Sequence, residues 1–207
     1  MPKRHKPETQ PSQTPKRGRP AGPDPRPAIL AAAMEAFSRY GVARTNMADI
    51  AAAAGVARTA LYRVFPDKRA IFRALAQAVQ DEALAKAQVV LEGRGTFAAR
   101  LEGALLARDL HLLQIGHSGP HADEIAELYA TQAADLAVAA NAALVNLLAQ
   151  AIKAAVAQKA FALKPSAPSP PALALVLRLA LEGVKKEVKD AAAFAALARQ
   201  VIRAILG

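Results

Sequence analysis

Residues 45–68 decide the fold of this chain, and they read TNMADIAAAAGVARTALYRVFPDK. Asn46 and Asp49 have the spacing at which two side chains cap each other's backbone donors at the start of a helix. Gly55 is suited to end that helix. A second short helix is expected over residues 58–64, before a proline interrupts the chain. Two short helices joined by a turn, behind a longer helix, are the layout of a helix-turn-helix.

The second short helix would enter the DNA major groove in such a motif. Six apolar residues are expected to close a small core with the preceding helix: Ile50, Ala51, Ala54, Val56, Leu61 and Phe65. That leaves Arg58, Thr59, Tyr62 and Arg63 pointing outward. An exposed face on so short a helix is ordinarily solvated surface, but two arginines and a tyrosine favour contact with DNA.

The positive charge is concentrated around this motif. The chain has a net charge of +10, and residues 1–75 hold 14 Lys and Arg against 5 Asp and Glu, which gives +9. A cluster of cations attracts a polyanion and releases its counterions on binding. Nucleic acid, here double-stranded DNA, is therefore the expected partner, and an anionic membrane surface is the alternative on charge alone.

Helical patterning continues along the whole chain, and no segment shows the alternation typical of a strand. The sequence predicts an all-α fold of about nine helices, at about residues 24–40, 46–55, 58–64, 68–91, 96–115, 122–129, 132–161, 171–188 and 191–205. We expect a disordered basic arm over 1–24, because it has six prolines and no aromatic or branched aliphatic residue. A helix-turn-helix DNA-binding domain is expected over 25–74, and an effector-binding and dimerisation domain over 75–207.

Four stretches of the sequence together resemble the DNA-binding domain of the TetR (tetracycline-repressor) family. They are RPAILAAA from Arg26, the isolated Phe37, Gly41 and Thr45, IAAAAGV from Ile50, and LYRVFPDK from Leu61. The resemblance covers about residues 26–72. It implies a homodimeric bacterial transcription regulator, a repressor released from a palindromic operator by a small-molecule effector.

The resemblance also implies roles for individual residues. Arg58 and Thr59 would face base edges. Contacts with the DNA backbone would come from Thr45, Asn46, Tyr62 and Lys68. Two positions depart from the family pattern: Ala57 leaves the recognition helix without a side-chain cap, and Val64 replaces a polar residue, for which Arg63 is expected to compensate.

The arm carries a motif of its own, KRGRP at residues 16–20, which resembles the core of an AT-hook. Arg17 and Arg19 would lie in a narrow A·T-rich minor groove, where negative potential is concentrated. General attraction to phosphates is the alternative explanation.

An effector site is expected between the helix that carries Arg108 and His111 and the long helix that carries Asn141 and Val145. Arg108 falls on an otherwise apolar stripe, and a buried arginine requires a partner. The partner is either an internal carboxylate or an acidic or carbonyl-bearing ligand.

The last two helices are apolar on more than one side, which predicts burial against a second copy of the chain. The residues expected in this dimer interface are Leu173, Leu177, Leu181, Val184, Leu197, Val201 and Ile205.

Other classes of function find little support in the sequence. There is no cysteine, and His111, His117 and His121 lack a spacing that would orient metal ligands, so we expect no metal site and no cofactor. No cluster of titratable side chains indicates an enzyme. The apolar run 133–152 contains Asp135 and Asn141, which argues against a membrane span and for a cytoplasmic protein. The alternatives are a nonspecific basic DNA-binding protein and a constitutive repressor without effector.

Overall fold

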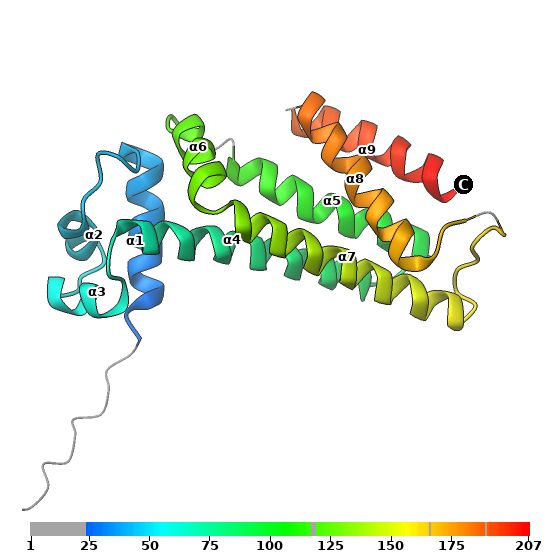
Figure 1. Cartoon of the computed structure of the whole chain (residues 1–207), viewed down its shortest axis with the longest axis horizontal. Helices are drawn as coiled ribbons and strands as arrows, with labels where there is room; N and C mark the ends of the chain where they lie inside the picture. The colour runs from blue at the N-terminus through cyan, green and yellow to red at the C-terminus, as the bar shows by residue number, and fades with distance from the viewer. Residues whose placement is uncertain (1–23, 117–118, 166, 189) are drawn as a thin grey trace, which may run out of the picture.

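The computed structural model describes residues 24–207 except positions 117, 118, 166 and 189, and the described residues form nine α-helices and no strand. The helices are α1 (Arg26–Tyr40), α2 (Met47–Ala53), α3 (Arg58–Val64), α4 (Lys68–Leu91), α5 (Phe97–Gly116), α6 (Ala122–Gln132), α7 (Ala134–Ala157), α8 (Pro170–Glu187) and α9 (Ala191–Leu206). The predicted all-α fold is confirmed. Figure 1 shows an elongated molecule with α1, α2 and α3 gathered at one end.

The N-terminal core joins α1, α2 and α3 to the beginning of α4. Ile29, Ile50, Leu61 and Ile71 are fully buried in it. The six apolar residues expected to close this core all contribute, four of them buried and two, Ala54 and Val56, partly buried against it. Removing such aliphatic side chains from water is the main force that holds three short helices together.

A second core fills the space between α5, α7, α8 and α9. Its largest fully buried side chains are Leu101, Leu105, Leu144, Leu148, Ile152, Leu177, Leu181 and Phe194. Alanines at the close approaches of these helices, such as Ala104 and Ala198, are also fully buried. The small side chains let the helix backbones approach each other closely.

Helix α4 belongs to both cores. Its first turns place Ile71 and Leu75 in the N-terminal core, and its last turns place Ala87 and Leu91 in the C-terminal core. At 1.5 Å per residue its 24 residues extend about 36 Å. The domain boundary predicted between residues 74 and 75 therefore falls within a continuous helix.

The junction of α6 and α7 differs from the expected boundaries. Helix α6 continues to Gln132, and α7 begins at Ala134 and ends at Ala157, not at residue 161. Ala133 interrupts the two helices with φ −139° and ψ 15°, and its side chain is fully buried in the N-terminal core. Burial of this methyl group against the DNA-binding domain fixes the position of the bend.

Within the described residues, α7 is long and apolar enough to cross a membrane by length and composition. Its Leu144, Leu148 and Ile152 are buried in the C-terminal core, and Asp135 in its first turn binds Arg73 of α4. These contacts are those of a helix in a folded domain.

Candidate DNA-binding interface

The helix-turn-helix is built from α2 and α3. The side chain of Asn46 accepts hydrogen bonds from the backbone N–H groups of Ala48 and Asp49, and the Asp49 carboxylate accepts one from Asn46, so the predicted reciprocal cap is present. Gly55 turns the chain with φ 65°, a conformation that favours glycine. Ala57 precedes α3 without a side-chain cap, as expected.

Helix α3 presents one polar face to solvent. Arg58, Thr59, Tyr62 and Arg63 are exposed, while Leu61 is fully buried beneath them. The Arg58 guanidinium lies 5.6 Å from the centroid of the Tyr62 ring, within the range of a cation–π contact. Neither arginine of this face has an acidic partner among the described residues, so both are available to an external anion.

A hollow of about 460 Å³ separates this face from the loop that precedes α2. Arg58 and Tyr62 line one side of it, and Arg44 and Asn46 line the other. Sequence reasoning missed Arg44, although a basic residue just before a helix cap in a basic domain was a usable signal. Arg58 of α3 and Arg44 before α2 therefore border one concave surface, and two cations placed in this way suit a phosphate backbone.

The expectation for Thr45 is corrected by the structure. Its side chain is buried, with 2% of its surface exposed, and its hydroxyl donates a hydrogen bond of 2.7 Å to the carbonyl oxygen of Gly41. A hydroxyl used in this way holds the end of α1 against the start of α2. Thr45 thus positions the interface, and its side chain does not reach the surface where DNA would lie.

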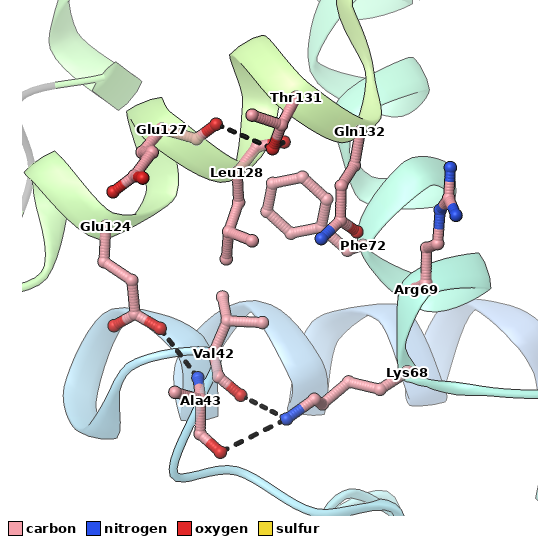
Figure 2. A pocket seen from close by; sticks show the side chains of 10 residues that line it. All are labelled: Val42, Ala43, Lys68, Arg69, Phe72, Glu124, Glu127, Leu128, Thr131 and Gln132. Carbon is pink, nitrogen blue, oxygen red and sulfur yellow. Dashed lines mark hydrogen bonds between the residues drawn. The ribbon is translucent and has the colours of Figure 1, made fainter.

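Lys68 is also engaged within the chain. Its Nζ atom donates to the carbonyl oxygens of Val42 at 2.5 Å, Thr45 at 2.8 Å and Ala43 at 3.3 Å. Figure 2 shows the lysine reaching back from the start of α4 to this loop. An ammonium group has three protons to donate, and the three carbonyls account for them. Lys68 thus supports the loop that carries Arg44, and it also lines the hollow beside α3, so its contact with phosphate stays a prediction.

Helix α6 docks onto the same loop from the C-terminal domain. Its Glu124 accepts a hydrogen bond of 2.7 Å from the backbone N–H of Ala43. A hollow of about 410 Å³ lies beside this contact, with Phe72 and Leu128 on its walls (Figure 2). The DNA-binding domain is therefore in direct contact with α6 of the C-terminal domain.

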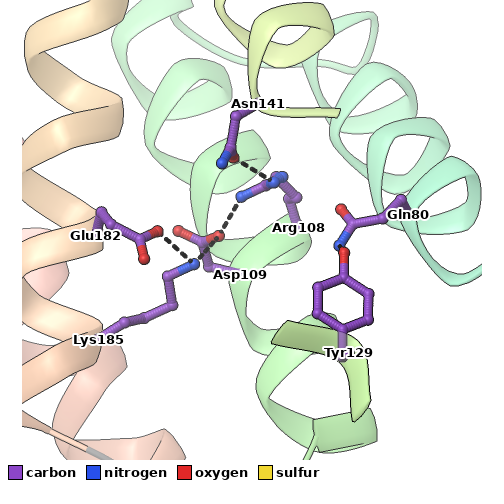
Figure 3. Close-up of polar contacts among 7 residues, drawn as sticks. All are labelled: Gln80, Arg108, Asp109, Tyr129, Asn141, Glu182 and Lys185. Carbon is purple, nitrogen blue, oxygen red and sulfur yellow. Dashed lines mark hydrogen bonds and ion pairs between the residues drawn. The ribbon is translucent and has the colours of Figure 1, made fainter. Parts of the chain in front are cut away.

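The polar residues expected at an effector site do come together, as Figure 3 shows. Arg108 is 4% exposed, and it donates to the carboxylate of Asp109 at 2.7 Å and to the side-chain oxygen of Asn141 at 2.8 Å. Lys185 lies 3.4 Å from the same carboxylate of Asp109 and 3.2 Å from Glu182. Two cations and two carboxylates balance, so the partner of Arg108 is the internal carboxylate. The acidic ligand inferred from a lone arginine is not needed.

The other two effector candidates lie nearby without forming a cavity with this network. His111 is mostly buried, with Nε2 3.7 Å from Glu82, and Val145 packs against the C-terminal core. His111, Val145, Arg108 and Asn141 do not line the hollows beside α3 and α6, nor those near the C-terminal end of α9.

Gln80 and Tyr129 form a hydrogen-bonded pair beside the Arg108 network, as Figure 3 shows. Gln80 of α4 donates a hydrogen bond of 2.6 Å to the hydroxyl of Tyr129, while its own side-chain oxygen is buried without a partner. Burial raises the pKa of the Tyr129 hydroxyl, against the opposite effect of the hydrogen bond from Gln80. Gln80 was not singled out from the sequence, because a glutamine on a helix gives no sign of being buried.

The residues expected in a dimer interface divide between core and surface. Leu173, Leu177, Leu181 and Val184 are at most 8% exposed and pack into the core of their own chain. This corrects the expectation for those four. Val201 and Ile205 are partly buried against the same core, and Leu197 is 38% exposed.

The outer face of α8 instead carries Leu175, Val176 and Leu179, which are 44%, 42% and 51% exposed. The sequence identified two apolar sides of α8, and the side that it assigned to a dimer interface is the one buried within the chain.

Two sets of predicted residues remain outside these observations. Arg17 and Arg19 of the arm, and His117, lie outside the described residues. In the part of the chain that the structure describes, no three His, Asp or Glu side chains gather as they would around a metal ion.

The family comparisons agree with this geometry. Residues 29–75 match the family described as bacterial regulatory proteins, tetR family. The nucleoid occlusion factor SlmA of Marinobacter nauticus is 35% identical over 80 residues, which are 39% of this chain and 41% of that protein. The transcriptional regulator RutR of Escherichia coli is 38% identical over 72 residues, 35% of this chain and 34% of that protein. The chain thus matches less than half the length of these curated relatives.

Structural similarity extends over most of the chain. SmeT, the repressor of a multidrug efflux pump of Stenotrophomonas maltophilia, superposes on 86% of this chain and 88% of its own with a TM-score of 0.62 at 22% identity. That likeness concerns the fold. Residues 29–75 thus match the DNA-binding domain of the tetR family, and the nine helices of the described residues share the fold of solved regulators such as SmeT.

Proposed function

We propose that this chain is a homodimeric transcriptional repressor that binds a palindromic DNA operator through α3 and releases it when a small molecule binds the C-terminal domain. The observation that carries the proposal is the exposed face of α3, where Arg58 and Arg63 have no acidic partner among the described residues and Arg58 borders a concave surface. Arginine can donate two hydrogen bonds to guanine, and the methyl group of Thr59 can contact thymine. Asn46 and Arg44 would bind the flanking phosphates.

Homodimer formation is supported by the outer face of α8 and its continuation on α9. Leu175, Val176, Leu179 and Leu197 are exposed apolar side chains on neighbouring helices, which is unusual on a monomer surface. Gly183 lies on the same side of α8, where the lack of a side chain allows close approach of a partner helix. Two such hairpins related by a two-fold axis would form a four-helix interface.

The proposed release of DNA by an effector is supported by the contact between α6 and the DNA-binding domain. A ligand changes DNA affinity only by binding two conformations unequally, and Glu124, bound to Ala43, would transmit such a difference. SmeT, which has a similar fold, has been solved in complex with triclosan, and this small-molecule complex supports this part of the proposal. A constitutive repressor without effector is the alternative.

Selection of bound fragments from random double-stranded DNA tests the central claim. We expect enrichment of a palindrome with half-sites separated by one or more helical turns, about 34–36 Å each. A nonspecific basic DNA-binding protein would enrich no motif, and its binding would vanish at raised salt. Thermal-shift screening of neutral and acidic metabolites, followed by DNA release, tests the effector separately.

A further inference from the structure

A hollow of about 590 Å³ lies between α5, α9 and the segment that follows α7. The C-terminal end of α9 is far from α1, α2 and α3 in Figure 1, so this hollow is remote from the proposed DNA-binding interface. It is also separate from the Arg108 network. Its volume is within the range of small-molecule sites, about 300–1,000 Å³.

The charged side chains of the hollow are mainly cations. Lys164, Arg199 and Arg203 line it together with one side-chain carboxylate, that of Glu102, and with Gly207. Glu102 is mostly buried, with 17% of its side chain exposed, and its carboxylate accepts from Arg203 Nε at 2.9 Å and Nη2 at 3.3 Å. Among the side chains, three cations thus face one carboxylate, and the Nζ atom of Lys164 lies beside Gly207.

Several donors of these cations are unused. Arg203 keeps its Nη1 group, and Arg199, whose Nε lies 3.6 Å from Glu102, keeps both Nη groups. No hydrogen bond from Lys164 Nζ to any described residue is present. Glu102 therefore holds two guanidinium groups side by side while leaving N–H donors for a ligand, an arrangement suited to an anionic head group.

The rest of the wall is apolar. Leu106, Phe161 and Leu206 line the hollow, and the Phe161 ring is fixed against Phe97 with centroids 5.2 Å apart. A second hollow of about 180 Å³ shares Phe161 and Leu206 and continues between the side chains of Leu163, Leu173 and Ile205. Lys164 lines both hollows, so a cation stands where they meet, beside the apolar side chains of Phe161 and Leu206.

We propose that the groove formed by these two hollows binds an amphiphilic organic anion, with its head group at Arg199 and Lys164 and its apolar body along Phe161 and Leu206. The site lies beyond the proposed effector region around Arg108. It also stays open in the proposed dimer, because Arg199 and Leu197 are two residues apart and so project about 200° apart around α9.

Isothermal titration of the full-length protein, without DNA, tests the proposal. The probes are decanoate, decyltrimethylammonium with the same tail and opposite charge, and acetate with the same head group and no tail, all below the concentration of micelle formation. We expect saturable binding of one decanoate per chain, with both other probes at least about tenfold weaker. Equal binding of decyltrimethylammonium would contradict the anion site, and equal binding of acetate would contradict the apolar groove.

Substitutions inside and outside the groove test where decanoate binds. The double change Lys164→Gln and Arg199→Gln should weaken decanoate binding about tenfold or more, and Ala99→Glu should do the same by adding a carboxylate at an exposed position on the rim. Arg94→Gln, in the exposed connection between α4 and α5, removes a positive charge elsewhere and should leave binding unchanged. Wild-type affinity in both groove variants, or an equal loss in the Arg94 variant, would overturn the assignment.

Discussion

Arg73 of α4 donates two hydrogen bonds to the carboxylate of Asp135 in the first turn of α7, at 2.8 and 2.7 Å. The same guanidinium donates to the carbonyl oxygen of Gln132 at the end of α6. One arginine of the DNA-binding domain thus holds the junction of two C-terminal helices. Together with the buried methyl group of Ala133, it fixes the angle at which the domains meet.

The Arg73–Asp135 pair predicts an acid-sensitive contribution to stability. The hydrogen bonds from Arg73 lower the pKa of Asp135 from 3.8 to about 2. Because the folded-state pKa is below the unfolded value, the contribution is present above about pH 4 and is lost as the pH falls toward 2. Asp135→Asn should therefore lower the melting temperature at pH 7, with a difference from wild type that narrows below pH 4.

Glu187→Gln is the matched control for that experiment, because Glu187 is exposed on α8 and has no ion pair with a described residue. A constant difference between Asp135→Asn and wild type across the whole pH range would show that the pair contributes no charge-dependent stability.

DNA recognition predicts different effects for residues that read bases and residues that support the loop. Arg58→Ala should cost about 1–3 kcal/mol of binding and relax specificity at one base pair. Lys68→Met should weaken binding to every sequence alike, because it leaves the carbonyls of Val42 and Thr45 unsatisfied. Fluorescence anisotropy on the selected operator and on single-base variants measures both. If both variants kept the wild-type affinity and base preference, the proposed contact of α3 with DNA would be wrong.

The basic arm predicts a change in salt dependence. Deletion of residues 1–20 removes six cations, namely Lys3, Arg4, Lys6, Lys16, Arg17 and Arg19. For each phosphate that the arm binds, the deletion should reduce the slope of log affinity against log salt by about 0.9. A weaker preference for A·T pairs beside the palindrome would assign Arg17 and Arg19 to the minor groove, and an unchanged slope would show that the arm does not touch DNA.

If the outer face of α8 forms the dimer interface, substitutions of two leucines on this helix should have different effects. Leu179 is 51% exposed and Leu177 is fully buried. Leu179→Glu should give a folded monomer, since it places a carboxylate only in the proposed interface, whereas Leu177→Glu should unfold the domain. Light scattering and circular dichroism separate the two results. Val89→Glu, at a 70% exposed position of α4, should stay dimeric. A dimeric Leu179 variant would place the interface elsewhere.

The buried network predicts a large effect of removing a single charge. Arg108→Met leaves the 3% exposed Asp109 with only the more distant Lys185, which should cost about 3–5 kcal/mol of unfolding free energy. The double variant with Asp109→Leu should recover part of that loss, because neither charge then lies buried without its partner. Urea denaturation measures both. A single variant as stable as wild type would indicate that water reaches Asp109.

The sequence predicted the local features of this molecule well. The cap of α2 by Asn46 and Asp49 and the bounds of α3 and α4 depend on residues within a few positions of each other. Such short-range interactions can be predicted from the sequence without knowledge of the fold.

The contacts that sequence reasoning missed depend on distant or unmarked partners. The carbonyls that bind Lys68 have no residue-type signature, because every residue carries one. Adjacent residues on a helix do not face each other, so nothing suggested that the long Arg108 side chain reaches Asp109. The two apolar sides of α8 were visible, but only the packing of α5 and α7 decides which one is buried.

Helix α4 continues without a break from one domain into the other. The number of residues in α4 therefore sets the rotation of the α1–α3 unit relative to the C-terminal domain. One residue inserted near Ala78 would advance the α1–α3 unit by about 1.5 Å and rotate it by about 100° about the α4 axis. In the proposed two-fold dimer both α1–α3 units would rotate equally about their own α4 helices, so the two α3 helices would no longer face the same side of a DNA duplex. The length of α4 would therefore set the operator spacing that the proposed dimer can bind.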